Sequence, residues 1–193
     1  MPKTFIVCSI LASEVEKVME ELGLSNKINY IPGALHVNLD KMQHALIENL
    51  NELKNADEST ALIVGTKCHP EIRKIAATYS AGIICGSNCI ELLLGEEKMK
   101  ELDNESKTFY LTSGWLREWR DIFCEGGLGW DSIDAKINFG RYDRILLLDT
   151  GLVEFSAQDI LDFFEYTEVP IDTYPVTLDH LKQKMLEIVD NRI

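Results

Sequence analysis

The sequence predicts an α/β protein with a three-layer α/β/α, Rossmann-like arrangement around a mainly parallel sheet. Short apolar runs alternate with helical segments along almost the whole chain. Two of these runs, residues 61–64 (ALIV) and 145–148 (ILLL), contain no polar residue. Such strands are typical of parallel sheets that helices cover on both faces. We therefore expect a sheet of about five or six strands and a single α/β domain over residues 1–193.

The first half of the chain contains four predicted strands, each followed by a helix. The strands are residues 4–10, 28–31, 61–64 and 83–84, and the helices are residues 13–23, 39–53, a segment from Pro70 onward, and 88–95. Ser13 and Glu16 have the spacing of a capping box. Gly23 is a typical helix-ending residue, and Asn88 is a typical N-cap. These signals predict a regular succession of β-to-α connections.

The second half of the chain continues the alternation less regularly. Strands are predicted at residues 109–111, 145–148 and 169–171, and helices at residues 115–122, 157–164 and 178–189. The run 145–148 is the most apolar of these strands, so we expect it to lie at the centre of a sheet. No repeat or low-complexity tract divides this half from the first.

The composition excludes some classes of function. The formal net charge is −13, with a sequence pI near 4.7, and charged residues make up 26% of the chain. Such a negative field repels phosphate backbones and anionic lipid surfaces, so we expect neither nucleic-acid nor membrane binding. No apolar stretch approaches the roughly 20 residues that span a bilayer, and the N-terminus does not have the pattern of a signal peptide. We expect a cytoplasmic protein.

The cysteines are the most informative residues. In a reducing compartment the five cysteines are not expected to form disulfides. Four successive predicted β-to-α connections carry Cys or His, namely Cys8, His36, the pair Cys68 and His69, and the pair Cys85 and Cys89. Ligands of open α/β sheets bind at the carboxyl ends of the strands. A single cysteine at a strand end is usually a packed apolar residue, but this repeated placement predicts a site.

Thiolate and imidazole are the natural ligands of zinc, while iron–sulfur clusters or other transition metals are alternatives. Our preferred ligands are Cys8, Cys68 and Cys89, with His36 as the fourth. Cys85 or His69 could replace His36. Helix N-termini are expected to lower the thiol pKa values of Cys68 and Cys89. A closed site has four protein ligands, whereas a catalytic site has three and an open position.

Three further residues are candidates for ligand or proton chemistry. Glu91 lies one helical turn after Ser87 and is a candidate general acid or base, although a solvated or capping role is equally compatible. Trp115 is a candidate for the wall of a cofactor or substrate cavity, against an ordinary core position. Asp149, at a strand end, is a candidate cofactor-binding residue, against common turn chemistry. Other residues are interpreted as structural (Cys124) or solvated (His44 and His180).

Several segments together resemble a known family. They are CSILASE, ALHVNLDKM, GTKCHPE, NCIELLLGEE, YLTSGWL and RILLLDTG, and they extend from Cys8 to about Ile171. The chain resembles an uncharacterised family, a domain of unknown function, often encoded beside corrinoid-dependent methyltransferases in methanogenic archaea and anaerobic bacteria. The family pattern has cysteines at positions matching Cys8, Cys68 and Cys89 and a histidine matching His36. Many members have His-Asp where this chain has Ser87-Asn88, so no histidine role is transferred to that loop.

The resemblance implies a link to one-carbon metabolism and a corrinoid protein or methyltransferase as partner. One hypothesis is a metal-dependent methyl-transfer component, in which a thiol is activated. The alternative is a non-catalytic metal or cofactor carrier, chaperone or regulator of a methyltransferase system. The corrinoid-binding pattern Asp-x-His-x-x-Gly is absent from the sequence, so a corrinoid carrier of the usual type is not expected. The two hypotheses differ in whether the metal keeps an open coordination position.

Overall fold

The strands form two separate parallel sheets. The computed structural model describes residues 2–55, 59–124 and 126–190. The first sheet has the order β2-β1-β3-β4 and consists of β1 (Thr4–Cys8), β2 (Lys27–Ile31), β3 (Thr60–Ile63) and β4 (Gly82–Ile83). The second has the order β5-β6-β7 and consists of β5 (Thr108–Thr112), β6 (Arg144–Asp149) and β7 (Ile171–Pro175). We call β1–β4 with their helices the first region and residues 108–175 the second region.

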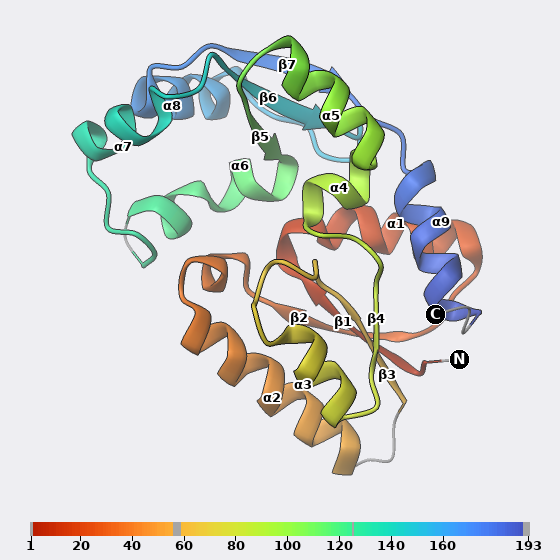
Figure 1. Ribbon diagram of the computed structural model, residues 1–193. Coiled ribbons are helices and arrows are strands. Elements are labelled where there is room, and N and C mark those ends of the chain that lie inside the picture. The colour runs from red at the N-terminus through yellow and green to blue at the C-terminus, as the bar shows by residue number, and fades with distance from the viewer. Residues whose placement is uncertain (1, 56–58, 125, 191–193) are drawn as a thin grey trace.

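Helices cover both sheets (Figure 1). The first region contains α1 (Ala12–Leu22), α2 (Leu39–Asn55), α3 (Ile72–Thr78) and α4 (Cys89–Leu94), with two short 3-10 segments, η1 (Ser9–Leu11) and η2 (Gly33–Val37). The second contains α6 (Ser113–Trp119), continued by a π-helical turn η3 (Arg120–Cys124), then α7 (Ser132–Phe139) and α8 (Ala157–Thr167). The helix α5 (Glu96–Glu105) connects the regions, and α9 (Asp179–Val189) packs against α1 and α4 of the first region.

The predicted α/β class with parallel strands flanked by helices is confirmed. The expectation of one continuous sheet is wrong. Two consecutive helices, α4 and α5, separate β4 from β5, and β5 pairs with β6 instead of joining the first sheet. The apolar strand β6 lies at the centre of its sheet, as its sequence predicts, because it pairs with both β5 and β7.

The helix ends differ from the predictions at one cap and agree at two. Asn88 caps α4 by accepting from the Glu91 backbone N–H at 2.9 Å, and Gly23 ends α1 in the left-handed conformation. The capping box of Ser13 and Glu16 does not form, because α1 continues directly from η1 and begins at Ala12. The Glu16 carboxylate instead accepts a hydrogen bond from the Tyr30 hydroxyl on β2. The structure also contains the helices α5 and α7, which the sequence patterns above do not predict.

The two regions share a hydrophobic core. One buried cluster contains residues of β1, such as Phe5 and Val7, together with Leu146 and Leu148 of β6. The start of α6 lies directly against η1, and a Cβ added at Gly114 would be 2.2 Å from the Ile10 carbonyl oxygen. This close approach fixes the carboxyl end of the first sheet against the second region.

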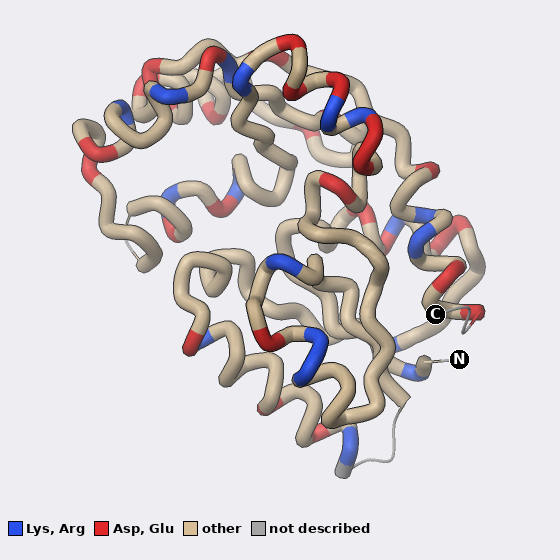
Figure 2. Tube along the Cα trace, in the orientation of Figure 1, with Lys and Arg blue, Asp and Glu red and all other residues tan. Residues whose placement is uncertain are grey.

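The acidic residues are spread along much of the chain and not gathered in one segment (Figure 2). Within the described residues, no helix has both the length and the apolar character needed to cross a bilayer.

Candidate functional site

Four donor side chains converge at the carboxyl edge of the first sheet. Cys8 ends β1, His36 lies in η2 after β2, Cys68 lies in the loop after β3, and Cys89 begins α4 after β4. All four line one cavity of about 20 Å³, which we call the thiol cavity. Parallel strands bring their carboxyl ends to one edge, and for this reason residues from four distant segments meet. A volume of this size holds about one ion or one water molecule.

The loops that carry Cys68 and Cys89 are held together by their backbones. The Thr66 N–H donates to the Gly86 carbonyl and the Lys67 N–H donates to the Ser87 carbonyl, both at 2.8 Å. A side chain at Gly65 would lie 2.4 Å from the Asn88 Cα, so only glycine permits this approach. The two loops therefore present their thiols to the same small volume.

The wall of the cavity between the donor atoms is apolar. Besides the four donors, the lining residues are Ile10, Leu11, Ile63, Val64, Gly65, Leu92 and Trp115. An apolar wall disfavours an isolated thiolate, because a buried charge needs a compensating partner.

The thiols hold their protons more strongly than free cysteine does. Burial raises the pKa of Cys68 to about 12, and the neighbouring Cys89 sulfur adds to the effect. Burial is likewise the main cause of the raised pKa of Cys8 and of Cys89. The expected lowering by helix N-termini is therefore outweighed, and Cys68 precedes α3, which begins only at Ile72. At neutral pH all three sulfurs are neutral thiols.

His36 and Trp115 complete the cavity. Their rings meet edge to face with centroids 5.6 Å apart. Burial lowers the pKa of His36, so its imidazole is neutral at pH 7 and has a free lone pair for a ligand. A hydrogen bond from Trp115 to the Cys89 sulfur favours the thiolate of Cys89. The cavity wall predicted for Trp115 is thus present beside the thiols.

The alternative fourth ligands lie elsewhere. His69 is buried, and its Nδ1 accepts from the Glu71 backbone N–H at 3.1 Å, which gives the ring a role in its own loop. Cys85 is exposed and lines a different hollow. Of the three candidates, His36 lines the thiol cavity.

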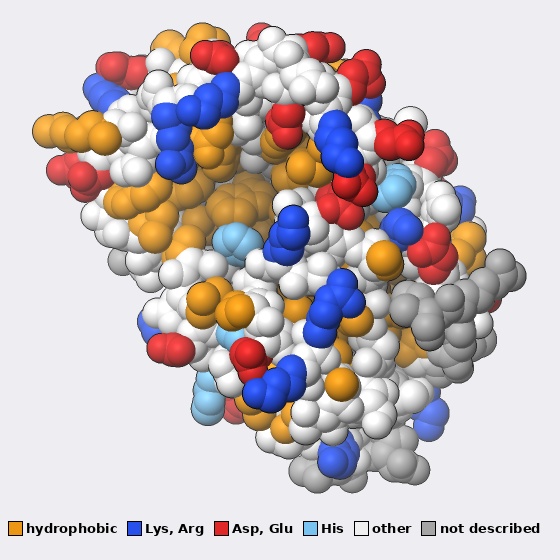
Figure 3. All heavy atoms as spheres, in the orientation of Figure 1, with side chains coloured by type: hydrophobic (Ala, Val, Ile, Leu, Met, Phe, Trp, Pro, Cys, Tyr) orange, Lys and Arg blue, Asp and Glu red, His pale blue; other side chains and the backbone are white. Residues whose placement is uncertain are grey.

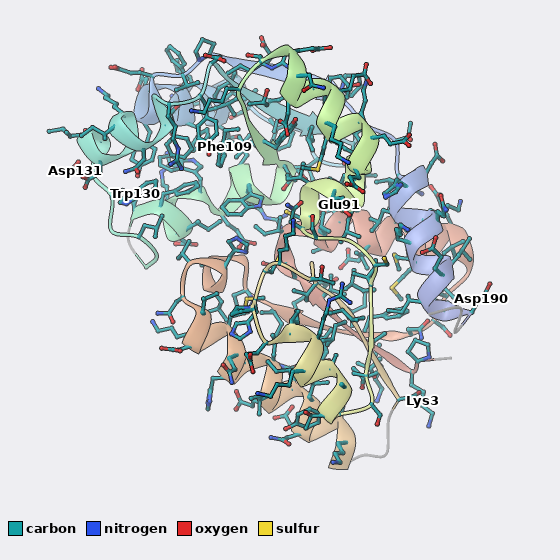
Figure 4. All side chains as sticks on the ribbon, in the orientation of Figure 1. Lys3, Glu91, Phe109, Trp130, Asp131 and Asp190 are labelled. Atoms are coloured by element: carbon teal, nitrogen blue, oxygen red, sulfur yellow. The ribbon has the colours of Figure 1, made fainter. Side chains whose placement is uncertain are left out.

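Glu91 and Asp149 are not brought to the thiols. Glu91, labelled in Figure 4, lines a surface hollow of about 610 Å³ together with Cys85 and His180. Its carboxylate accepts a hydrogen bond from the Ser87 hydroxyl. The Asp149 carboxylate accepts from the Gly151 N–H at 2.8 Å, which is turn chemistry at the end of β6.

The residues interpreted as structural or solvated lie mostly as expected. Cys124 packs against the aromatic cluster of the second region, and His44 is exposed on α2. His180 is partly buried beside the hollow that Glu91 lines, where burial lowers its pKa.

A buried carboxylate near the site was missed by sequence reasoning. Glu14 is only 1% exposed and accepts hydrogen bonds from Ser113 Oγ at 2.7 Å and Thr150 Oγ1 at 3.2 Å. Its charge contributes to the raised pKa of Cys89. The signal was available, because Glu14 lies four residues before Val18 on the apolar face of α1. It links α1 of the first region to two segments of the second.

A larger cavity of about 280 Å³ adjoins the thiol cavity. The two cavities share His36, Cys89 and Trp115 in their walls. The remaining lining residues of the larger one are Asn88, Ile90, Met99, Thr108, Phe109, Tyr110 and Tyr142. Figure 3 shows a hollow with hydrophobic side chains between the two regions. A small molecule in this cavity could contact Cys89 and His36 directly.

The donor chemistry fits a soft or borderline metal ion, since three thiols and one neutral imidazole surround a volume of single-ion size. In the described part of the chain, however, no three His, Cys, Asp or Glu side chains stand in positions ready to ligate a metal. The thiols are protonated, and binding would require them to lose protons and draw closer.

Comparisons with known proteins identify a family but no function. A family model described as a protein of unknown function (DUF1638) matches residues 30–185, a range that contains His36, Cys68, Cys89 and Trp115. No curated protein and no solved structure matches the chain.

Proposed function

The chain belongs to the DUF1638 family of proteins of unknown function, and we propose that it binds one zinc ion through Cys8, Cys68 and Cys89, next to His36. One observation carries the proposal: these four side chains, from four separate β-to-α connections, line one small cavity. Scattered structural cysteines would have no reason to share a cavity with a neutral histidine. The cavity size favours a single ion over an iron–sulfur cluster.

The electrostatics of the cavity support a cation. Burial in the apolar wall raises the pKa values of the three thiols. A thiolate without a compensating positive charge is therefore destabilised there. A divalent cation offsets that cost, because it compensates the charges and replaces the thiol protons. The hydrogen bond from Trp115 to Cys89 already favours one thiolate. Zinc, when bound, supplies Lewis acidity that lowers the pKa of a coordinated thiol or water.

The adjoining cavity supports an open coordination position. Cys89 and His36 lie in the walls of both cavities, so a substrate in the larger one reaches the donor set. His36, neutral at pH 7, is placed to accept a proton from that substrate. We therefore propose a metal-dependent reaction of a small molecule. Following the family resemblance, we propose that the protein is a methyl-transfer component that works with a corrinoid protein or methyltransferase.

A second candidate is a non-catalytic carrier, chaperone or regulator. The observation that favours it is that, among the described residues, no three donor side chains stand ready to ligate. A site that must rearrange to bind suits transient loading and release of metal. The two candidates differ in whether a substrate enters the coordination sphere.

Metal analysis of anaerobically purified protein tests the common premise. We expect about one zinc per chain in the native protein and a loss of most of it in Cys68→Ser. The matched control is Cys124→Ser, since Cys124 is also a partly buried free cysteine but packs in the second region. Equal stoichiometry in the two variants would overturn the ligand assignment.

Cobalt substitution separates the two candidates. A small thiol should change the absorption spectrum of the cobalt-loaded protein if a coordination position is open. The change should disappear when the larger cavity is blocked, for example by Thr108→Trp, because Thr108 lines that cavity and not the thiol cavity. An unchanged spectrum at saturating thiol would favour the carrier.

A further inference from the structure

We infer that the larger cavity binds a flat aromatic molecule that carries one anionic group. The inference deepens the proposed function, on which it rests for the chemistry at the inner end, by naming the class of ligand. The cavity extends from Cys89 and His36 to the strand β5, an edge strand of the second sheet. Phe109 of this strand is labelled in Figure 4.

The wall of the cavity is mostly aromatic and is held by contacts among the rings themselves. It includes the rings of His36, Phe109, Tyr110, Trp115 and Tyr142. The Phe109 ring meets Tyr142 at 5.4 Å and 64°, and Trp115 meets His36 at 5.6 Å and 79°. Rings that already support each other lose little conformational freedom when a further ring packs between them.

These rings are also anchored from behind. Phe109 packs edge to face on Phe139 at 4.9 Å, and Trp115 stacks on Phe123 at 5.8 Å. Phe123 and Phe139 are buried in the core of the second region. The wall is therefore preformed and does not have to be assembled by the ligand.

The volume limits the size of the ligand. At about 280 Å³ the cavity is slightly below the range of roughly 300–1,000 Å³ typical of sites for drug-sized molecules. One ring, or two fused rings with a short substituent, fills it. A nucleotide cofactor or a corrinoid is too large to be enclosed.

The charges around the cavity favour an anion. None of its lining residues is Asp or Glu, although the chain has a net charge of −13. The Arg141 guanidinium lies 5.2 Å and the Lys107 ammonium 5.9 Å from the centre of the Tyr142 ring. Within the described residues, neither cation forms an ion pair with a carboxylate.

The nearby carboxylates are each engaged by another group. Asp143 accepts from the Lys107 backbone N–H at 2.9 Å, Asp103 accepts from the Tyr110 hydroxyl at 2.7 Å, and Glu105 pairs with Arg144 at 3.4 Å. A cationic ligand is disfavoured because Tyr142 already has two cations over its ring. The anionic group of the ligand is thus expected near Lys107 and Arg141, with its ring toward Trp115.

A charge-matched ligand series tests the inference. We would measure binding of 2-naphthoate, 2-naphthalenemethanol and 2-naphthylmethylammonium to the full chain by equilibrium dialysis, with and without loaded zinc. The naphthoate should bind at least about tenfold more tightly than the other two, since both the ring contacts and the charge favour it. Equal binding of the three probes would overturn the anion preference.

Matched variants locate the binding. Tyr142→Ser should weaken naphthoate binding about tenfold or more. Tyr79→Ser should leave binding unchanged, although Tyr79 likewise carries a lysine, Lys54, at 5.6 Å over its ring. Lys107→Gln combined with Arg141→Gln should abolish the preference for naphthoate over the alcohol. Circular dichroism verifies that the variants are folded. Tyr142→Phe should keep naphthoate binding, because it retains the aromatic ring.

The two proposals fail separately. If zinc binds with the expected stoichiometry and naphthoate does not bind, the ligand inference is wrong and the metal site stands. If naphthoate binds and Tyr142→Ser weakens it, but no zinc is found, the ligand inference stands and the metal site is wrong. Naphthoate binding that Tyr142→Ser does not change overturns the location in this cavity.

Discussion

The first and second regions contribute different chemistry to the candidate site. At the carboxyl edge of the first sheet lie three thiols and an imidazole, and the loops that carry Cys68 and Cys89 contact each other through their backbones. In the second region, Asp149 at the carboxyl end of β6 forms a turn, while the aromatic wall is formed by Phe109 near the start of β5, Tyr142 before β6 and Trp115 of α6. The first region supplies donor atoms, and the second supplies shape and apolar surface.

This difference explains why the candidate site needs both regions. The thiol cavity lies at the edge of the first sheet, but Trp115 closes it from α6 of the second. The larger cavity in turn has Cys89 and His36 at one end and β5 at the other. Variants that loosen the contact between the regions should therefore disturb ligand binding even where no donor residue is changed.

The largest effect is expected from Gly114→Ala. The added Cβ would lie 2.2 Å from the Ile10 carbonyl oxygen, so α6 must move away from η1. We expect a loss of about 4 kcal/mol or more in the free energy of unfolding, measured with urea, because the clash is with backbone. The control is Gly82→Ala, where the nearest atoms are 3.4 Å away. Equal stability of the two variants would mean that the regions are not tightly coupled.

The next effect is a loss of stability at moderately alkaline pH that comes mainly from the thiols of the first region. The folded-state pKa values of Cys8, Cys68 and Cys89 are raised by burial. Their stabilising contribution is fully present below the unfolded pKa of about 8.5 and is lost as pH rises toward the folded values. At pH 9.5 the metal-free protein should lose up to about 1.4 kcal/mol per thiol.

Thermal unfolding at pH 7.5 and 9.5 measures this loss. Cys8→Ser should reduce the pH dependence, whereas Cys124→Ser in the second region should leave it unchanged. Saturating zinc should reverse the sign of this pH dependence, because the folded thiols are then already deprotonated while the unfolded thiols still lose protons between pH 7.5 and 9.5. A pH dependence that survives in a variant lacking all three thiols would assign it to other groups.

The sequence predicts the first region better than the second for a physical reason. The parallel strands bring Cys8 and the loops of Cys68 and Cys89 to one edge of the sheet, as the sequence predicts. The final approach of the two loops depends on their backbone contacts and on Gly65, which the strand pattern does not show. The role of Asp149 depends on which backbone N–H lies nearest to its carboxylate. The cavity that Glu91 lines depends on how α4 packs on α9. Neither can be read from strand and helix periodicity.

The division into two sheets also depends on tertiary packing. The apolar strands β3 and β6 have similar sequences, and nothing in either shows that they belong to different sheets. The predicted lowering of the thiol pKa values is wrong, because burial outweighs any effect of a helix N-terminus. Both errors concern contacts between segments distant in the chain.

A smaller effect is expected from Glu14, which bridges the regions. Glu14→Ala leaves the buried hydroxyl of Ser113 and the partly buried hydroxyl of Thr150 without their acceptor, so we expect a loss of about 2 kcal/mol in the free energy of unfolding. Glu14→Gln retains an acceptor oxygen and should cost less. The control is Glu20→Ala on the exposed face of the same helix, where only the pair with Lys17 is lost. If Glu14→Ala unfolds at the same urea concentration as the control, the bridge is not stabilising.

The smallest effect is expected at Asp149, and it distinguishes the two interpretations of this residue. If its carboxylate only orders the turn after β6, Asp149→Ala should cost about 1 kcal/mol through loss of the bond from the Gly151 N–H. Asp149→Asn, whose side-chain oxygen still accepts that bond, should cost almost nothing. Neither variant should change zinc stoichiometry or naphthoate binding, because Asp149 lines neither the thiol cavity nor the larger cavity. A loss of ligand binding in Asp149→Asn with unchanged stability would show instead that the negative charge of Asp149 contributes to binding, and the carboxyl edge of the second sheet would then supply chemistry as the first does.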